Sequence, residues 1–566
     1  MERLPSLLSR PFDLAHAGEF LTFAAAGLLA TLLALAPLLL LARFAMPGKT
    51  RWPALHLVFL ASPTADALSR GGSHHGGAAW PWILLAVATG GAILYSRAAR
   101  LQTTLRGLGR WSTRLSALVL VSGLVAALLP AKGRVRTFTT ARAEQPNVLL
   151  ISIDSLRRDH LHCYGYPRAT SPNLDRLASQ GMRFETVAAP TTWTLPSHLT
   201  LLTALPPERH GVVRDGLALA QGVRSLAQLF GEGGYATAGF VAGPYLDAGY
   251  GFARGFDLYD DYSVARATMR EAHRVVTSPG SYRITSRWLD RWDREGRRRP
   301  FFVFLHLWDV HADYNPPEPY ASMFRPDRAP ASEGAPSAVS ESVELGAMIA
   351  RYDGEIAFTD YYLGRVFEQL RAMGEWDRTV VVVTADHGEE FREHGQLGHH
   401  KNLYDETLLV PLLIRYPPRV PAAAVHPSLV RLMDIAPTLL TLAGLARPPD
   451  FGLPEARDLS PYFDPKEQPR PRVAFADLDG ELGAIRTDGE KLIACDGEGT
   501  SRECYDLSLD PGETRNLSGS DPVRSAALAE SLDSWRRAMR GGADPGRVSP
   551  GIEQRELLRS LGYTRE

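Results

Sequence analysis

The chain of 566 residues is too long for one small hydrophobic core, so two or more folding units are expected. It carries 62 basic and 63 acidic residues, a net charge of −1, and no basic–aromatic tract, so the composition gives no support for nucleic-acid binding. Three cysteines are too few for a disulfide scaffold, and their spacing fits no zinc finger.

Residues 1–140 are typical of a transmembrane region with three or four helices. Residues 20–41 form an uncharged, mostly apolar run that is long enough to cross a bilayer, and 78–95 and 115–129 are two further charge-free candidates. Residues 53–68 are a weaker fourth candidate, because polar residues interrupt them. A cleaved signal peptide is the alternative for the first run, but that run is too long and further candidates follow it.

Basic residues in the loops predict the orientation of this region. Five arginines crowd the loop before the last span: Arg97, Arg100, Arg106, Arg110 and Arg114. The positive-inside rule places this loop in the cytoplasm, so the last span delivers the rest of the chain to the outer side. This result is the same for three spans and for four.

The soluble region alternates apolar strands with helices. A polar linker at 141–146 leads into three buried strands, at 147–153 (NVLLISI), 301–307 (FFVFLHL) and 379–384 (TVVVVT). Helices are expected near 173–180, 223–230 and 344–374, a further strand at 236–241, and a mobile surface loop at 326–342. This alternation predicts an α/β fold with a doubly wound sheet over residues 147–453.

The pattern changes after residue 453. Short alternating stretches at 473–478, 483–487 and 491–495 predict a small antiparallel subdomain over 454–520. Residues 521–566 form an expected helical tail, with a helix at 525–539. Cys495 and Cys504 flank a short turn and are candidates for a disulfide in an oxidising compartment.

The segment 191–198 (TTWTLPSH) opens a helical run. Thr194 stands where an N-cap belongs, and Pro196 lies in the first turn, where its missing N–H costs nothing. Unpaired backbone N–H groups and the positive end of the helix dipole would then lie beside a hydroxyl, a place suited to an oxyanion ester. Alone, a threonine before Leu-Pro-Ser is an ordinary cap.

Polar residues follow each of the three buried strands. They are Asp154, His311, Asp386 with His387, and the later pair His399 and His400. Ligands of open α/β sheets lie at the carboxyl ends of strands. Two carboxylates, an imidazole and a hydroxyl favour one divalent cation such as Zn²⁺ or Mn²⁺ and leave Ca²⁺ or Mg²⁺ open. Such a cation would lower the pKa of the Thr194 hydroxyl, and the other histidines would bind substrate oxygens or protonate a leaving group. Each residue alone also fits a structural cap, turn or hydrogen bond, but their joint placement favours a site.

Several long stretches resemble the sulfatase branch of the alkaline phosphatase superfamily across about residues 147–516. They occur in the order of that family: NVLLISIDSLRRDHL, TSPNLDRLASQG, TLPSHLTLLTALPPERHGV, HLWDVHADYNPP, TADHGEEFREHGQLGHHKNLYDE and CYDLSLDPGETRNL. The resemblance implies an alkaline-phosphatase-like doubly wound sheet, followed by the small antiparallel subdomain and preceded here by the all-α transmembrane region.

The resemblance also implies roles for single residues. It implies three metal ligands and a nucleophile that also touches the metal: Asp154, Asp386, His387 and Thr194. His311 is implied as a substrate-binding or acid residue. His399 and His400 both lie near the Lys or His that the family places before Leu-Tyr-Asp-Glu; His399 is favoured, but a shift of one residue would select His400.

The departures from the family pattern bear on the substrate. Sulfatases place Cys or Ser at the position of Thr194 and oxidise it to formylglycine, so no formylglycine is expected here. The Arg that closes the sulfatase signature is His198, the second of the paired aspartates is Ser155, and the Lys-Trp-His motif is replaced by residues 240–242. These changes remove much of the cationic surface that holds a sulfate. A threonine nucleophile resembles phosphonate monoester hydrolases, lipoteichoic acid synthases and phosphoethanolamine transferases, and the last two also carry N-terminal membrane spans.

The sequence therefore predicts a membrane-anchored, metal-dependent enzyme whose catalytic domain lies on the periplasmic or extracytoplasmic side of a bacterial-type inner (plasma) membrane. Thr194 would attack the phosphorus or sulfur of an ester, and water or an acceptor hydroxyl on a lipid or glycan would resolve the adduct. Threonine favours phosphorus. The alternatives are an arylsulfatase-like sulfuric ester hydrolase and a catalytically inactive, membrane-tethered binding domain. The metal-ligand set speaks against the inactive domain, and a transporter has little support.

Overall fold

The structure is a computed structural model that describes residues 145–261, 277–325, 337–468, 470–495 and 501–548. The chain divides into two compact units, Met1–Val135 and Arg136–Glu566, and the described residues belong to the second. The predicted spans within residues 1–140 lie outside the described residues and stay a prediction. Among the described helices, none is both long enough and apolar enough to cross a bilayer.

The second unit is built on an eight-stranded sheet in the order β11-β2-β10-β7-β1-β6-β4-β5. Its strands, in chain order, are β1 (Asn147–Ile153), β2 (Met182–Ala188), β4 (Ala236–Phe240), β5 (Leu258–Asp260), β6 (Phe301–Leu307), β7 (Thr379–Thr384), β10 (Leu412–Arg415) and β11 (Ala424–Arg431). All neighbouring strands are parallel except at β10, which runs antiparallel to both β2 and β7. The fold is therefore a mixed α/β fold with a mainly parallel sheet.

The three predicted apolar runs form the centre of this sheet. Strand β1 pairs with β6 on one side and β7 on the other, so that Ile151 faces Leu305 and Val383 across the two ladders. Every residue of the three strands is buried. Burial on both faces explains why these strands are continuous apolar runs without polar alternation.

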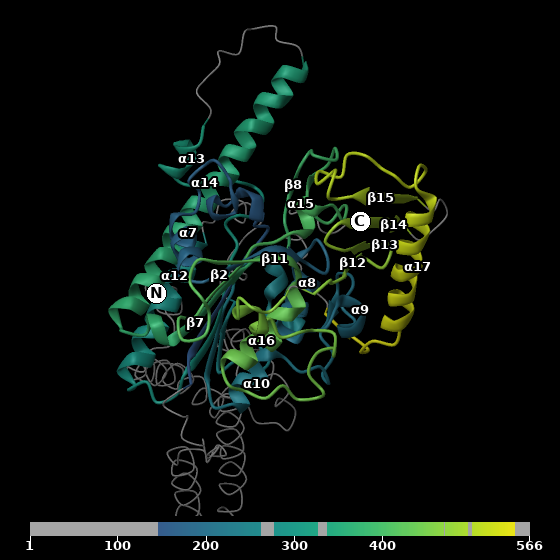
Figure 1. Cartoon of the computed structure of the whole chain (residues 1–566). Coiled ribbons are helices and arrows are strands. Elements are labelled where there is room, and N and C mark those ends of the chain that lie inside the picture. Colours follow the sequence, from purple (N-terminus) through teal and green to yellow (C-terminus); the bar gives the residue numbers. More distant parts are fainter. Residues whose placement is uncertain (1–144, 262–276, 326–336, 469, 496–500, 549–566) are drawn as a thin grey trace, which may run out of the picture. The chain divides into compact units, whose positions relative to one another are not determined.

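Helices cover both faces of the sheet (Figure 1). One face carries α7 (Pro172–Ser179), α12 (Ser278–Arg294) and α14 (Ser337–Ala372), and the other carries α8 (Thr194–Thr203), α10 (Leu226–Glu232) and α16 (Ile435–Leu442). The short helices are α9 (Pro207–His210), α13 (Tyr320–Met323) and α15 (Asp405–Leu408). Helix α14 begins at Ser337, earlier than predicted, so it takes in the last residues of the expected loop at 326–342.

A second sheet of four antiparallel strands follows the large one in the chain. Its strands are β12 (Ala474–Leu478), β13 (Leu482–Arg486), β14 (Glu490–Cys495) and β15 (Arg502–Asp506), and α17 (Pro522–Met539) packs on it (Figure 1). Leu528 and Leu532 of α17 share a core with Leu492 and Cys504. Two ribbons of two strands complete the described part: β3 (Leu217–Ala218) with β16 (Gly546–Arg547), and β8 (Glu390–Phe391) with β9 (Leu397–Gly398).

The strand register corrects the expected disulfide. Cys504 lies opposite Leu492, three residues from Cys495 along the ladder, and both cysteines are free thiols. Because side chains alternate between the faces of a strand, Cys495 points away from the face that carries Leu492 and Cys504. The two sulfurs therefore cannot meet.

Candidate active site

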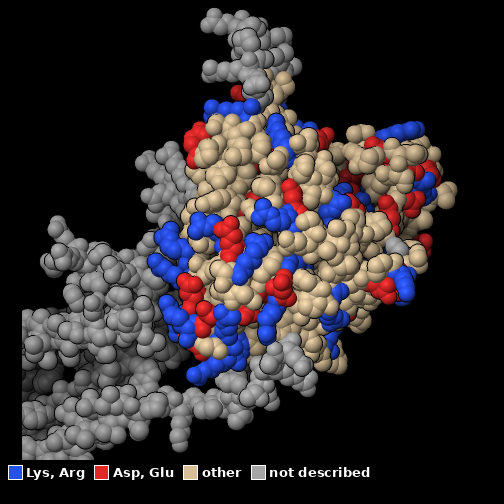
Figure 2. Space-filling view, turned by 60° about the vertical axis from the view of Figure 1, so that its left-hand side comes forward, with Lys and Arg blue, Asp and Glu red and all other residues tan. Residues whose placement is uncertain are grey.

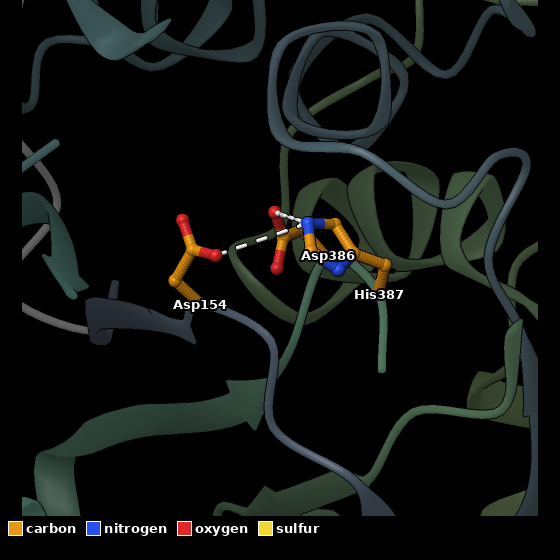
Figure 3. A group of neighbouring side chains, drawn as sticks. All are labelled: Asp154, Asp386 and His387. Atoms are coloured by element: carbon orange, nitrogen blue, oxygen red, sulfur yellow. Dashed lines mark ion pairs between the residues drawn. The ribbon is translucent and has the colours of Figure 1, made fainter. Parts of the chain in front are cut away.

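Two carboxylates and an imidazole meet at the carboxyl ends of β1 and β7. Asp154 follows β1 directly, and Asp386 and His387 come after β7, its neighbour in the sheet. All three side chains are fully buried, and one ligand atom from each lies within 4.8 Å of the others. His387 Nε2 is 3.2 Å from Asp386 Oδ2 and 3.8 Å from Asp154 Oδ1 (Figure 3).

Thr194 points at the same place, although it is not the N-cap of its helix. The N-cap is Trp193, whose extended backbone (φ −156°, ψ 158°) turns the chain into α8 one residue before the predicted start. The Thr194 hydroxyl is therefore not used by the cap. Its Oγ1 lies 3.5 Å from Asp154 Oδ2 and 3.4 Å from His387 Nε2.

The donor set fits a divalent cation. His387 Nδ1 lies 2.9 Å from the Gly388 carbonyl oxygen, which can only accept, so Nδ1 carries the hydrogen and the Nε2 lone pair faces the carboxylates. Asp386 Oδ2 is buried without a hydrogen-bond partner, and within the described residues no lysine or arginine pairs with Asp154 or Asp386. Two buried carboxylates with oxygen and nitrogen donors around them suit a metal ion.

The surroundings of the site shift the pKa values of its two carboxylates in opposite directions. Burial raises the pKa of Asp386 well above its usual range, and the charge of Asp154 raises it further. Burial also opposes ionisation of Asp154, but the neighbouring imidazoles of His306, His311 and His387 hold the pKa of Asp154 well below its usual range. Such a split is the behaviour of two like charges that share one buried space.

Two further buried histidines, His306 and His198, lie next to the carboxylates of the site, and the sequence analysis assigned them no role there. His306 belongs to β6; its Nδ1 accepts a hydrogen bond from the Ala242 N–H at 3.4 Å, so Nε2 carries the hydrogen and faces Asp154 Oδ2 at 3.3 Å. Sequence analysis assigned His306 to an apolar strand. The only sign of a functional role was that it is the one histidine in that run.

His198 occupies the place of the arginine in the sulfatase signature. Its Nδ1 donates to the Thr194 carbonyl at 2.9 Å and its Nε2 lies 2.9 Å from Ser152 Oγ. Burial lowers the pKa of His198 to about 3, and the nearby His306 imidazole acts in the same direction. At neutral pH this position is therefore an uncharged imidazole.

The remaining predicted histidines separate into two groups. The ring of His399 lies 4.4 Å from that of His387 and 4.9 Å from that of His311, measured between centroids. Burial lowers the pKa of His311 to about 4 and that of His399 well below its ordinary value, so both are neutral at pH 7. His400 turns away: it stacks on Trp193 at 4.8 Å and its Nε2 lies 3.1 Å from both carboxylate oxygens of Asp479.

The small antiparallel sheet fixes the loop that carries these histidines. Lys491 of β14 is fully buried, and its Nζ lies 2.8 Å from Asp405 and 2.7 Å from Glu513. Arg486 of β13 also binds Asp405, at 3.0 Å. Asp405 begins α15, directly after the loop, so this buried charge cluster joins the second sheet to the edge of the site.

Comparison with known proteins identifies the family. The family model described as Sulfatase matches residues 146–445, which is more than half of the chain. The chain belongs to the sulfatase family. The match covers the strands and loops that carry Asp154, Thr194, His311 and the Asp386–His387 pair.

The relatives include a sulfatase and a multifunctional member of the alkaline phosphatase superfamily. A protein named Sulfatase from Formosa agariphila is 24% identical over 427 residues, covering 66% of this chain and 83% of that protein. The multifunctional alkaline phosphatase superfamily protein PehA of Trinickia caryophylli is 25% identical over 500 residues, covering 69% and 95%.

Solved structures show the same range. The phosphonate monoester hydrolase of Agrobacterium radiobacter matches with a TM-score of 0.58 at 25% identity, covering 72% of this chain and 100% of that chain. A protein solved in complex with its substrate D-glucosamine-2-N,6-O-disulfate has a TM-score of 0.58 at 19% identity, covering 70% and 98%, which shows the shared fold. The chain is thus a sulfatase-family hydrolase, and the proteins that it resembles include ones named for sulfated and for phosphonate substrates. Enzymes of this family bind a metal ion.

Proposed function

We propose that Thr194 is the nucleophile of a metal-dependent enzyme that cleaves phosphate- or phosphonate-type esters. The observation that carries this proposal is the position of Thr194 Oγ1, within 3.5 Å of both an Asp154 oxygen and His387 Nε2. A hydroxyl in contact with the atoms that would hold a metal is in the right place to attack an ester bound there. Thr194 is also 3% exposed, so water is largely excluded from its surroundings.

The residues of the chain divide the work. Asp154, Asp386 and His387 would hold the cation, with Zn²⁺ or Mn²⁺ favoured and Ca²⁺ or Mg²⁺ open, and when bound it supplies Lewis-acid stabilisation of negative charge on the ester and on the Thr194 oxygen. The backbone N–H groups in the first turn of α8 point their dipole at the same anionic oxygens.

Two neutral imidazoles serve the substrate. The His399 ring lies beside those of both His387 and His311. The Nδ1 hydrogen of His311 is taken by the Ala312 carbonyl oxygen at 2.6 Å, so its neutral ring offers the Nε2 lone pair as a hydrogen-bond acceptor for a protonated substrate oxygen or water. His399 is also our candidate for the residue that protonates the leaving oxygen, which needs a proton when the leaving alcohol is a poor one. His400, paired with Asp479, is assigned no chemical step.

Sulfate-ester hydrolysis is the second candidate function, because several relatives are named sulfatases. Two features support phosphorus instead. Threonine replaces the residue that sulfatases convert to formylglycine, and the neutral His198 replaces the signature arginine. A catalytically inactive binding domain is the third candidate, and a complete donor set for a metal argues against it.

We also propose that residues 1–140 anchor the enzyme in a bacterial-type inner membrane with the catalytic domain outside, so that water or a lipid or glycan hydroxyl accepts the transferred group. Apolar runs and the arginine-rich loop support this proposal. A reporter fused after residue 566 tests the orientation. We expect activity from a reporter that works only outside the cytoplasm. Activity from a reporter that works only in the cytoplasm would overturn the proposed orientation.

The function is tested with the full-length protein and its Thr194→Ala variant. Both are assayed on an aryl sulfate, an aryl phosphate diester and an aryl phosphonate, with each candidate metal added in turn. We expect turnover of the phosphorus esters that depends on Thr194. Turnover of the sulfate alone would contradict the preference for phosphorus, and equal activity of the variant would contradict the role of Thr194.

A further inference from the structure

A buried glutamate lies directly behind His399. Glu389 is fully buried; its Oε1 lies 2.8 Å from His399 Nδ1, and its Oε2 accepts a hydrogen bond from the Tyr314 hydroxyl at 2.7 Å. Each carboxylate oxygen therefore has one partner, and the two partners come from different loops at the carboxyl edge of the sheet.

The local fold dictates this pairing. Strands β8 and β9 form an antiparallel ribbon in which Glu390 faces Gly398. Continuing this register by one residue places Glu389 opposite His399, and side chains of opposed residues lie on the same face of a ribbon. Gly398 has φ +91°, a conformation that favours glycine, and a Cβ built there would lie 3.7 Å from Glu389 Oε1. The turn thus brings His399 onto the carboxylate.

The contacts of Glu389 differ from those of the neighbouring glutamate. Glu390 is equally buried, and its carboxylate accepts backbone N–H groups of His394 and Gln396, at 3.0 and 2.6 Å, which fixes the turn between the strands. Glu389 uses its carboxylate for the His399 ring and the Tyr314 hydroxyl, and among the described residues no lysine or arginine pairs with it. Burying a carboxylate without a cation is expensive, and a neutral amide would fix a turn at lower cost.

We propose that Glu389 is a positioning residue for the reaction proposed above, one that holds the His399 ring with a hydrogen on Nδ1 and so dedicates Nε2 to proton exchange with the substrate. Tyr314 fixes the second carboxylate oxygen and with it the plane of the carboxylate. A carboxylate can only accept, so it selects the tautomer of the imidazole it contacts and stabilises the imidazolium that forms during the reaction. The inference rests on the proposed function.

The proton transfers balance over the two halves of the reaction. His399 starts neutral, with a lone pair on Nε2, and the Thr194 hydroxyl first passes its proton to that nitrogen, which forms the imidazolium. In the first half the Thr194 oxygen bonds to phosphorus, the bond from phosphorus to the leaving oxygen breaks, and that oxygen takes the proton from His399 Nε2. The N–H electron pair stays on the imidazole, which is neutral again. In the second half water gives one proton to Nε2, its oxygen bonds to phosphorus, and the Thr194 oxygen leaves with the electron pair of its bond to phosphorus. Glu389 gains and loses no atom.

The test is the dependence of rate on the leaving group. Full-length wild type and Glu389→Gln are assayed for kcat/KM on aryl esters whose phenols range from 4-nitrophenol to unsubstituted phenol, since a good leaving group needs no proton and a poor one does. General acid catalysis contributes at least roughly 100-fold, so we expect a loss of roughly threefold with 4-nitrophenol and roughly 100-fold with phenol. A loss of the same size for every leaving group would overturn the proposal.

Two further variants separate positioning from folding. Glu390→Gln is the matched control: it changes the next glutamate of the same ribbon, whose carboxylate accepts backbone N–H groups of the turn, and any loss it causes should be independent of the leaving group. His399→Gln should show the same rising loss as Glu389→Gln, and the double variant should add nothing to it, since Glu389 acts through His399. Additive losses in the double variant would overturn the proposal.

A measurement of the His399 tautomer tests the role of Glu389 independently of the proposed function. Activity that survives Thr194→Ala would overturn the nucleophile and leave the tautomer to be judged by nitrogen NMR of the labelled histidines, with His399→Gln used for assignment. We expect the His399 hydrogen on Nδ1 in wild type and on Nε2 in Glu389→Gln, where the amide donates. The same tautomer in both proteins would overturn the inference regardless of activity.

Discussion

The Oγ1 atom of Thr194 lies 3.4 Å from Nε2 of His387. The hydroxyl at the start of α8 and the imidazole that follows β7 therefore face the same position in the site. We expect Thr194→Ala to lower kcat on a phosphorus ester by at least roughly 1,000-fold, because it removes the attacking oxygen. Thr194→Ser keeps that oxygen and should retain activity well above that of the alanine variant. Equal loss in both variants would mean that the threonine methyl group, and not its hydroxyl, is what matters.

Metal removal should change stability as well as activity. Chelation should abolish turnover, and added Zn²⁺ or Mn²⁺ should restore it and raise the melting temperature, because binding to the native state alone contributes about 2.7 kcal/mol at a hundredfold excess over Kd. Metal content of the dialysed protein and a thermal melt measure the two effects. A melt that is indifferent to every divalent cation tested would contradict the assignment of the donor set.

His306 should tune the metal affinity without touching the metal. Its Nε2 hydrogen faces Asp154 Oδ2 at 3.3 Å, so His306→Leu removes the imidazole N–H that faces this oxygen and should weaken metal binding about 10- to 100-fold. His306→Gln, which keeps an N–H donor, should retain most of the affinity. Titration of the metal-free protein measures both, and equal affinity in the leucine variant would exclude this role.

The strands at the centre of the sheet could be read from the sequence because burial on both faces makes β1, β6 and β7 continuous apolar runs. Strands β2, β10 and β11 could not, since their signals are weaker: β10 has four residues, and β11 contains Pro427 and a register shift between His426 and Leu429. Proline and irregular pairing are typical of an edge strand, and β11 is at the edge of the sheet.

The site was predictable where chemistry follows the end of a strand, as for Asp154 and the Asp386–His387 pair. Sequence analysis missed His306 because it lies inside a strand, where one polar residue in an apolar run has no local signature. It missed Glu389 because the partners of this residue, His399 and Tyr314, are brought to it by the register of a ribbon and by a loop 75 residues away in the chain. The sequence also could not choose between His399 and His400, whereas the turn at Gly398 directs only His399 towards His387.

The buried lysine of the second sheet should be essential for stability. Lys491 lies between Asp405 and Glu513, so Lys491→Met leaves the buried Glu513 carboxylate without a cation and Asp405 with Arg486 alone, and should destabilise the protein by about 3–5 kcal/mol. Urea unfolding measures the loss. The exposed Lys466→Met provides a matched control and should change stability by less than about 0.5 kcal/mol. A small effect of Lys491→Met would mean that the cluster does not join the two sheets.

Stability should fall as pH rises because of Glu355 on α14. Burial raises the pKa of Glu355 to about 9, and the charge of Asp309 adds to the effect. The folded state therefore keeps a proton that the unfolded state loses above its ordinary pKa, so the stabilisation present at low pH is lost as pH rises towards 9. Glu355→Gln keeps the oxygen that accepts the Asn315 N–H, and its advantage over wild type should grow from pH 5 to pH 9. The exposed Glu368→Gln on the same helix is the control, and parallel stability curves for wild type and Glu355→Gln would contradict the prediction.

The most direct test of the central claim is to trap the covalent adduct. Wild type is mixed with an activated aryl phosphonate, quenched in acid at successive times within one turnover, digested, and the peptide that contains Thr194 is analysed by mass spectrometry. The account predicts a phosphonyl group on Thr194 that appears as fast as the phenol is released, decays as the phosphonate product forms, and is absent in Thr194→Ala. Full turnover with an unmodified Thr194 at every time point, or with the adduct on another residue, would contradict it.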